Sequence, residues 1–277
     1  MAIEYKEGKM NKEIIIGDWK MPECDTEASM NMWSARAQEF AKQRGVEDDD
    51  WVAALVKRHG MLPADGAFLD VGCGAGKYTV YFAKKCAEAW GTDFSEEMIK
   101  NAEQRAREAG TGNAFFSCDN WHTLEMADKD WKGKFDFVLA NMTPAIQSAE
   151  TFEKLTEASC GWCLYIHPVL RTGSVADRLK KKIFGKKPDP RYPQLQYAFN
   201  LLWEKGLFPA VEYREHNWVR SFELERAVDI FKNDLRSKRT LTDEEEASIE
   251  KYLIEHAVNG IVEEEVRTTQ FALYWEV

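Results

Sequence analysis

A short apolar stretch that runs directly into a glycine loop is the feature that most constrains the fold of this chain. GAFLDV, residues 66–71, is typical of a buried strand, GCGAG follows as a loop, and a helical pattern begins at Lys77. The same succession of strand and helix returns until about residue 169. Because a parallel return between strands needs a crossover long enough to hold a helix, this alternation predicts a parallel sheet.

The whole chain of 277 residues is long enough for one large α/β domain with additions. We expect a Rossmann-like sandwich with a mostly parallel sheet of about seven strands, an N-terminal helical cap and C-terminal helical insertions. Residues 1–45 are predicted to form an N-terminal arm and the cap helix, and residues 46–277 the main domain. Within that domain we expect a basic insertion at 171–192 and a helical insertion at 221–258.

Three aspartates come at or next to the ends of successive predicted strands, which places them at the carboxyl rim where open α/β sheets bind ligands. Asp70 precedes the glycine loop, Asp93 lies about 20 residues further on, and Asp119 follows the third strand. A carboxylate about 20 residues after the first glycine of such a loop can reach the ribose hydroxyls of a nucleoside. The spacing G-x-G-x-G disfavours a dinucleotide, whose pyrophosphate needs G-x-G-x-x-G. Three acids without a basic clamp suit a cationic ligand.

The block LDVGCGAGKYTVYFA followed by GTDFSEEMIKNA resembles the first two motifs of the class I S-adenosylmethionine-dependent methyltransferases. FSCDNWHTL and KFDFVLANMTPAI resemble the third-strand and fourth-strand motifs, and WSARAQEF resembles the helix that often closes over the cofactor in the small-molecule branch. The resemblance implies a methyltransferase that uses S-adenosyl-L-methionine and releases S-adenosyl-L-homocysteine.

The resemblance also implies individual roles. Asp70 and the loop glycines would border the methionine part of the cofactor, Asp93 would hold the ribose, and Asp119 would accept from the adenine amino group. The predicted cofactor-binding residues are Asp70, Gly72, Cys73, Gly74, Gly76, Asp93, Phe94, Met98, Asp119, Asn120, Trp121 and Asn141. No metal ligand is predicted.

His167 and Asn141 are the candidate catalytic residues. His167 ends the fifth predicted strand at the same rim, and His122 is the second candidate for a general base. A base is needed only when the acceptor is a hydroxyl, a phenol or a carbon acid. A histidine that simply bonds within a turn is the alternative reading for His167. The segment Asn141-Met142-Thr143-Pro144 departs from the Asn-Pro-Pro-Tyr pattern of nucleic-acid amino methyltransferases.

The net charge of −10 repels polyanions, so the sequence predicts a small-molecule acceptor and neither nucleic acid nor membrane as a partner. Trp33, Trp121 and Trp218 are candidates for an aromatic acceptor pocket, although core packing explains each of them as well. The basic segment between Arg178 and Arg191 is either a guide for an anionic substrate or a solvated face.

The predicted location is cytoplasmic, because no run of about 18 apolar residues or signal peptide is visible. The sequence leaves the oligomeric state open.

Two other functions remain open at this point. One is a nicotinamide-dependent oxidoreductase, which the glycine spacing disfavours. The other is a non-catalytic sensor or scaffold that binds S-adenosylmethionine and methylates nothing. The Cys160-Gly-Trp-Cys163 pair has the spacing of a redox or metal site, but it leads into a predicted strand rather than a helix, which favours a structural role.

Overall fold

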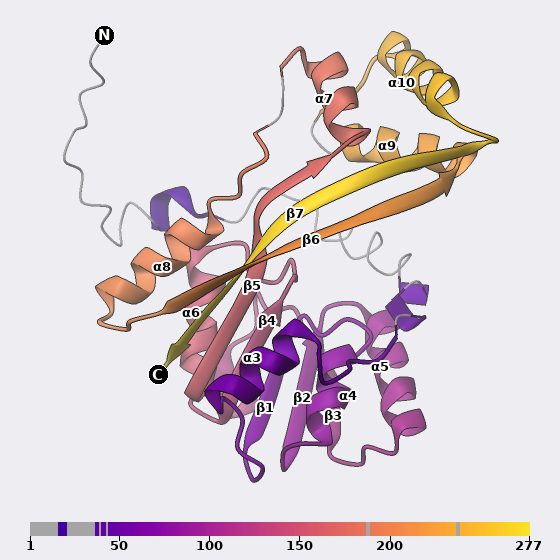
Figure 1. Cartoon of the computed structure of the whole chain (residues 1–277). Helices are drawn as coiled ribbons and strands as arrows, with labels where there is room; N and C mark the ends of the chain where they lie inside the picture. Colours follow the sequence, from indigo (N-terminus) through magenta and orange to yellow (C-terminus); the bar gives the residue numbers. More distant parts are fainter. Residues whose placement is uncertain (1–15, 21–36, 39, 43, 187–188, 237–238) are drawn as a thin grey trace, which may run out of the picture. The chain divides into compact units, whose positions relative to one another are not determined.

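Seven strands pair into one sheet in the order β3-β2-β1-β4-β5-β7-β6, as the computed structural model shows. The structure describes residues 16–20, 37–38, 40–42, 44–186, 189–236 and 239–277. β1 is parallel to β2 and β4, β2 to β3, and β4 to β5. Figure 1 shows β7 running against both β5 and β6. The predicted Rossmann-like α/β fold with about seven mostly parallel strands is therefore confirmed.

The elements alternate as the sequence predicts. The strands are β1 (Ala67–Val71), β2 (Glu88–Asp93), β3 (Ala114–Cys118), β4 (Phe135–Asn141), β5 (Ser159–Gly173), β6 (Ala210–Glu223) and β7 (Ile261–Glu276). The helices are α3 (Trp51–His59), α4 (Lys77–Ala83), α5 (Glu96–Ala109), α6 (Ala149–Ala158), α7 (Ala176–Phe184), α8 (Gln194–Glu204), α9 (Leu224–Arg236) and α10 (Asp243–His256), with a short 3₁₀ helix, η1, at Met126–Lys129.

Helix ends follow the capping chemistry of the sequence. The Ser95 hydroxyl accepts from the Met98 N–H at the start of α5, and Gly110 ends that helix with a φ of 68°. Thr242 and Glu245 form the expected capping box of α10. The helix expected after the glycine loop is shorter than its pattern predicts: α4 stops at Ala83, because the chain must already enter β2 at Glu88.

The chain divides into two compact units. The first comprises Met1–His167, Gln194–Glu212 and Ala272–Val277, and the second comprises Pro168–Pro193 and Tyr213–Phe271. This division differs from the predicted one between residues 45 and 46, which stays a prediction.

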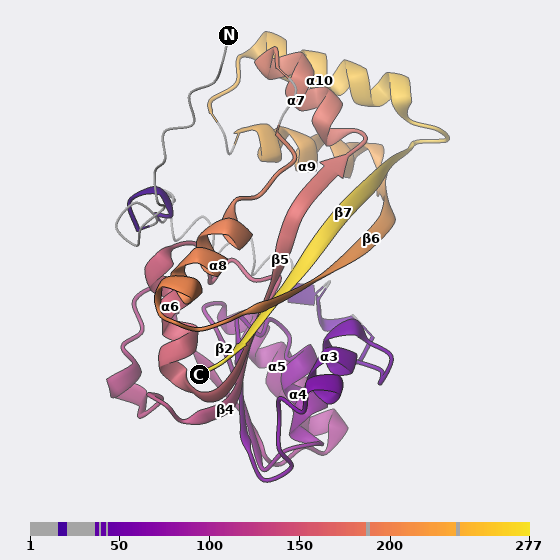
Figure 2. The same cartoon turned by 60° about the vertical axis from the view of Figure 1, so that its left-hand side comes forward.

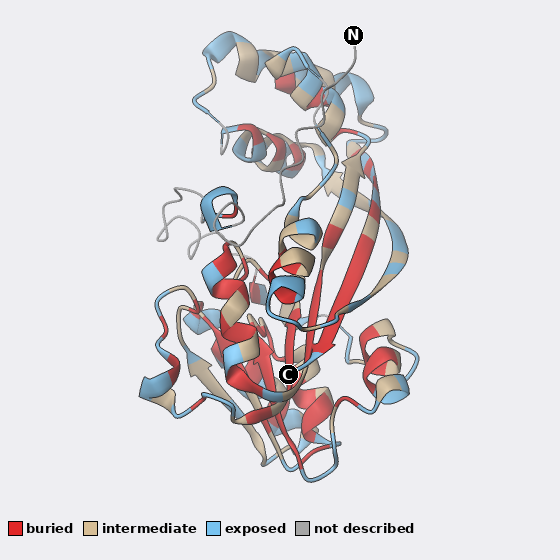
Figure 3. Cartoon of the chain, turned by 90° about the vertical axis from the view of Figure 1, so that its left-hand side faces the viewer, coloured by how far each residue is buried: buried red, intermediate tan, exposed pale blue. Residues whose placement is uncertain are grey.

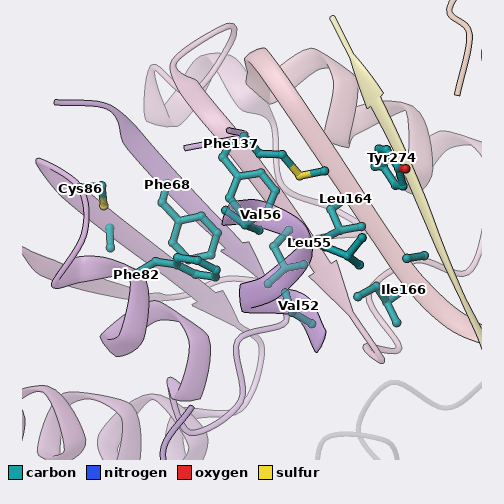
Figure 4. Packing of buried hydrophobic residues seen from close by; sticks show 14 of the residues in the cluster. Val52, Leu55, Val56, Phe68, Phe82, Cys86, Phe137, Leu164, Ile166 and Tyr274 are labelled. Carbon is teal, nitrogen blue, oxygen red and sulfur yellow. The ribbon is translucent and has the colours of Figure 1, made fainter. Parts of the chain in front are cut away.

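In the first unit, helices cover both faces of the sheet. Figure 2 shows α3, α4 and α5 on one side and α6 and α8 on the other. Figure 3 shows that the central strands are almost wholly buried. Phe68, Phe82 and Phe137 pack against Leu55 and Leu164 beneath α3 and α4, as Figure 4 shows. This apolar layer fixes the strands whose carboxyl ends carry the candidate site.

The second unit has its own apolar core. Leu179 of α7, Phe231 of α9 and Leu253 of α10 pack together with Val262 of β7. The described part of the predicted basic insertion contains the end of β5 and α7, where Lys180 pairs with Asp234 at 3.0 Å. The predicted helical insertion at 221–258 begins late, because β6 continues to Glu223 before α9 starts.

Candidate functional site

The glycine loop between β1 and α4 turns back over the end of β2. The N–H groups of Gly72 and Cys73 donate to the Thr92 carbonyl oxygen at 2.8 and 2.9 Å. Gly72, Gly74 and Gly76 all have positive φ, at 68°, 52° and 72°. Residues with a Cβ rarely adopt this left-handed backbone conformation, so the three glycines make the turn possible.

The three glycines differ in what surrounds them. A Cβ on Gly72 would lie 1.8 Å from Thr143 Oγ1, and one on Gly76 would lie 2.8 Å from the Ala102 Cβ of α5. A Cβ on Gly74 would meet nothing closer than 3.9 Å. Gly72 and Gly76 are thus required for packing, whereas Gly74 has room for a methyl group, which would be in van der Waals contact with Met98 and Phe40.

Asp93, at the end of β2, ties the loop to the next helix. One carboxylate oxygen accepts from the Gly74 N–H and the other from the Ser95 N–H, both at 3.0 Å. Burial raises the pKa of Asp93, and the hydrogen bonds from the Ser95, Gly74 and Phe94 backbone oppose that rise. The residue is 9% exposed, so it can still present an oxygen edge to a ligand.

Asp70 is buried on the α4 side of the sheet. Its carboxylate accepts from the Thr79 hydroxyl at 2.8 Å, and burial raises its pKa to about 7, with a smaller contribution from the charge of Asp93. Thr79 lies on α4, and sequence reasoning did not single it out because only the packed fold brings it to Asp70. The predicted contact of Asp70 with the cofactor stays a prediction.

Asp119 lies directly beside Asp93 at the rim. The Asp119 N–H donates to the Asp93 carbonyl oxygen at 3.0 Å, and Cys118 is in register with Asp93. Asp119 Oδ1 lies 2.9 Å from Lys129 Nζ, while Oδ2 is buried and has no hydrogen-bond partner among the residues that the structure describes. A buried acceptor without a donor is costly, so this oxygen is suited to accept from a ligand.

The loop that follows Asp119 is held by α6. Lys154 Nζ donates to the carbonyl oxygens of Trp121, His122 and Leu124, at 3.1, 3.1 and 2.9 Å. The Trp121 indole donates to the Thr151 carbonyl oxygen at 2.9 Å and is 3% exposed. The Trp121 side chain therefore packs between this loop and α6, and its predicted contact with the cofactor stays a prediction. Lys154 was missed because its partners are backbone atoms, which no side-chain motif marks.

Other predicted cofactor residues lie close to the loop. Asn120 Oδ1 accepts from the His122 N–H at 3.1 Å, which shapes the turn after Asp119. Met98 is buried, and its sulfur is 3.9 Å from the position that a Cβ on Gly74 would take. Phe94 is half-buried between Asp93 and the start of α5, and Cys73 is a buried free thiol.

A short described part of the predicted cap also reaches this place. Phe40 Cδ1 lies 3.9 Å from the same hypothetical Cβ on Gly74. The Ala37 carbonyl oxygen accepts from the Asn101 side chain, and the Phe40 carbonyl oxygen accepts from Arg105, both on α5. Ala37 and Phe40, described residues of the segment that resembles a cofactor-closing helix, therefore lie against α5, and Phe40 is beside the glycine loop. Trp33 lies outside the described residues.

The rim continues at the end of β4, where β5 runs beside it. Asn141 is in register with Ile166, and Met142, which follows it, has an unusual φ of 53°. The Met142 N–H donates to the Ile166 carbonyl oxygen at 2.9 Å. This left-handed turn directs Thr143 onto Gly72, so the loop after β4 and the glycine loop touch each other.

His167 directly follows Ile166 at this rim, but it belongs to the α6 side of the sheet. Its ring centroid is 5.9 Å from that of Tyr165, and Cys163, in the same alternation, donates from Sγ to the Leu155 carbonyl oxygen on α6. Asp70 instead faces Thr79 of α4. The two candidate catalytic residues thus differ: Asn141 alternates with Leu139 on the α4 side, and His167 lies on the other.

The weaker candidates have ordinary structural roles. Burial lowers the pKa of His122, and a hydrogen bond to the Pro144 backbone partly opposes this lowering. Cys160 is exposed and Cys163 is buried, and both are free thiols. Across the described residues no cluster of three or more His, Cys, Asp or Glu could hold a metal ion. Within the same residues no helix has the length and apolarity to cross a membrane.

Comparison with known proteins agrees with this geometry. A protein-family profile described as "Methyltransferase domain" matches residues 63–176, which include the glycine loop, Asp93 and Asp119. The crystal structure of magnesium protoporphyrin IX methyltransferase from Synechocystis PCC 6803 with bound SAH has a similar fold. Its TM-score is 0.51 at 20% identity, over 70% of this chain and 93% of that one.

Two curated relatives match by sequence over shorter stretches. An uncharacterized RNA methyltransferase of Chlorobaculum tepidum is 37% identical over 71 residues, 24% of this chain and 14% of that protein. The 23S rRNA (uracil(1939)-C(5))-methyltransferase RlmD of Shewanella sediminis is 35% identical over 88 residues, 31% of this chain and 19% of that protein. The chain spans less than a fifth of the length of these curated relatives.

These relatives correct the predicted partners. The sequence analysis excluded nucleic acid on the ground of net charge, and that exclusion is wrong, since the matched relatives carry RNA methyltransferase names. The physical reason is that total charge describes the field far from the molecule, whereas recognition depends on the charges near the site.

The glycine loop and the paired acids at the rim thus lie within a region that matches the profile of a methyltransferase domain, residues 63–176, and this region has the fold of a crystallised methyltransferase.

Proposed function

We propose that this protein transfers the methyl group of S-adenosylmethionine to an acceptor that enters at the end of β4, beside Ile166 of β5. The observation that carries the proposal is the arrangement of Gly74, Asp93 and Asp119. Gly74 has room beside it for a small group, the Asp93 carboxylate accepts from the Gly74 N–H, and the buried Asp119 Oδ2 lacks a donor among the described residues.

These residues fit the chemistry of the cofactor. The adenine amino group would supply the donor that Asp119 Oδ2 needs, the ribose diol would donate to Asp93, and the methionine part would lie along Gly74. The acids supply negative charge without a phosphate clamp, as a sulfonium nucleoside requires. When bound, S-adenosylmethionine supplies an activated methyl carbon that an acceptor lone pair attacks as the carbon–sulfur bond breaks.

The residues of the chain mainly position the acceptor and exclude water. Asn141 and the left-handed turn at Met142 form the wall next to the glycine loop, where an acceptor must approach to about 3 Å from the methyl carbon. His167 would take the acceptor proton only when the acceptor atom loses one in the reaction. Because the His167 side chain is on the α6 side of the sheet, such an acceptor must extend past β5 to that side.

Calorimetric titration with S-adenosylmethionine and S-adenosylhomocysteine tests the cofactor site. We expect Asp93→Asn and Asp119→Asn to weaken binding about 10- to 100-fold, because a hydrogen bond to a charged group contributes about 1.5–3 kcal/mol. Asp189→Asn is the matched control, since Asp189 is exposed and pairs with Arg191 at the surface. Absence of binding in the unmodified protein at millimolar ligand contradicts the proposal, and binding of NADH instead would favour an oxidoreductase.

A second experiment identifies the acceptor class. Sequence reasoning predicts a small molecule, and the names of the curated relatives suggest RNA. The protein is incubated with methyl-labelled S-adenosylmethionine and a cell extract separated into RNA, protein and small-molecule fractions. Label in one fraction assigns the class. Tight binding of the cofactor with no label in any fraction would instead favour the non-catalytic sensor.

A further inference from the structure

The second unit carries a concentration of positive side chains on one face of its strands. Alternation along β6 places Arg214, His216, Trp218 and Arg220 on the same face. Arg171 of β5 joins them, because its guanidinium carbon lies 5.3 Å from the centroid of the Trp218 ring. None of these side chains belongs to the methyltransferase site described above.

Contacts on this face hold two of the arginines in place. Arg171 Nε donates to Thr268 Oγ1 at 3.3 Å, and Arg214 donates from Nε and a terminal nitrogen to Gln270 Oε1, at 3.3 and 2.7 Å. The indole of Trp218 packs against Arg171 on one side and is 4.9 Å from the His216 ring. A stacked, half-buried guanidinium has its plane fixed, which suits it to recognise a planar or tetrahedral oxyanion.

The negative charge facing these groups from β7 is already engaged. The Glu264 carboxylate is fully buried and pairs with Arg220, and it also accepts from the Ala176 N–H at 2.9 Å. The contacts that hold Arg171 and Arg214 to β7 are made with neutral oxygens of Thr268 and Gln270. In the part of this face that belongs to the second unit, which begins on β6 at Tyr213, the described strands thus hold three guanidinium groups and one carboxylate.

The positive charges on this face lie close enough to lower one another's pKa. Burial lowers the pKa of His216, and the positive charges of Arg214 and Arg171 lower it further. Burial likewise lowers the pKa of Arg171, and the positive charge of Arg220 lowers it further. A bound anion would relieve this repulsion, and because the groups are partly withdrawn from water, the gain is less screened than at an open surface.

We propose that Arg171, Arg214 and His216 form a binding site for an oxyanionic group, phosphate or carboxylate. His216 is exposed and marks the open side of the site, while Trp218 is its apolar support. The site does not depend on the proposed methyl transfer, because all its residues belong to the second unit.

An anion titration of the full chain tests the site. Sodium phosphate and sodium succinate are added at constant ionic strength, with sodium chloride as the reference, and the imidazole signals are followed by NMR, that of His216 being assigned with a His216→Gln variant. We expect one of the two anions to shift the His216 signal saturably and chloride not to do so. Equal responses to all three salts would overturn the proposal.

Charge-removing variants show whether the named residues are responsible. Arg171→Gln and Arg214→Gln should each raise the dissociation constant at least about tenfold, as expected for loss of a charge-assisted hydrogen bond. Arg267→Gln is the matched control, because Arg267 is an exposed arginine of β7 that pairs with Glu265 and belongs to the opposite alternation. Unchanged affinity in both site variants, or equal loss in the control, would refute the site. Cooperative thermal melting of each variant, followed by circular dichroism, shows that it is folded.

A competition arm identifies the source of the anion. A single-stranded RNA oligonucleotide is added to the phosphate-saturated protein. Displacement of phosphate in the unmodified protein, with less binding of the oligonucleotide to Arg171→Gln, assigns the site to RNA phosphates. Retention of phosphate assigns it to a small anionic molecule.

Discussion

Replacement of Lys154 by Met tests whether α6 holds the loop that follows Asp119. Methionine keeps an unbranched apolar side chain of similar length and removes the ammonium group. The carbonyl oxygens of Trp121, His122 and Leu124 then lose the donor they share. Lys154 is 8% exposed, so water replaces the ammonium poorly.

The expected loss of stability follows from two opposing terms. Each carbonyl left without this donor costs about 1–3 kcal/mol, whereas removing a buried ammonium recovers several kcal/mol of desolvation. We expect a net loss of about 3 kcal/mol in the free energy of unfolding, which lowers the melting temperature by roughly 6–10 °C. Because Asp119 and Asn120 begin the same loop, the affinity for S-adenosylhomocysteine should also fall, by about tenfold or ~1.4 kcal/mol.

Urea unfolding and calorimetry measure the two effects separately. Lys132→Met is the control, since Lys132 is an exposed lysine whose nearest acid, Glu157 of α6, is 3.9 Å away. We expect it to change stability by less than about 0.5 kcal/mol. A Lys154→Met protein with lower stability and unchanged cofactor affinity would show that the loop keeps its place without Lys154. Unchanged stability would refute the bonding itself.

Four further substitutions test the loop and its acids. Gly72→Ala should prevent stable folding, because the added Cβ would overlap Thr143. Gly74→Ala should lower the free energy of unfolding by only about 1 kcal/mol, because of the positive φ, and should weaken cofactor binding. Thermal melting measures the first effect and calorimetry the second. The pKa of Asp70, raised to about 7 by burial, means that the folded chain keeps this proton to higher pH than the unfolded chain, so stability falls as pH rises from about 4 to about 7. Asp70→Asn should flatten that part of a stability profile measured by denaturation across pH. Asp93→Asn should lower the melting temperature as well as the affinity, since the carboxylate accepts from two backbone N–H groups, and an unchanged melting temperature would contradict the bonds described.

Local chemistry made much of the fold predictable. The glycine loop, the position of Asp93 and the cap at Ser95 each depend on a few neighbouring residues, so their sequence spacing carries the information. The rim also follows from spacing, because parallel strands in register bring Asp93 and Asp119 together once both end a strand.

Contacts between distant segments could not be read in the same way. Lys154 meets a loop about 30 residues earlier through backbone oxygens, and Thr79 meets Asp70 from the following helix. His167 was expected to end the fifth strand, but it lies within β5, which continues to Gly173, and its side of the sheet depends on the strand alternation through Tyr165, which the sequence pattern alone did not resolve. The extension of β5 to Gly173 was also missed, because its last residues are polar.

The error about nucleic acid has a physical origin that the second unit illustrates. A net charge of −10 sets the potential far from the molecule, but at physiological salt charges further than about 8 Å apart are largely screened. Near Arg171, Arg214 and Arg220 the local sum is positive, although the chain as a whole is acidic. If RNA phosphates bind this face through two or three contacts, the logarithm of the binding constant should fall with the logarithm of salt concentration with a slope of roughly −1.4 to −2. A slope near zero would mean that an oligonucleotide binds by other contacts, whatever the total charge of the chain.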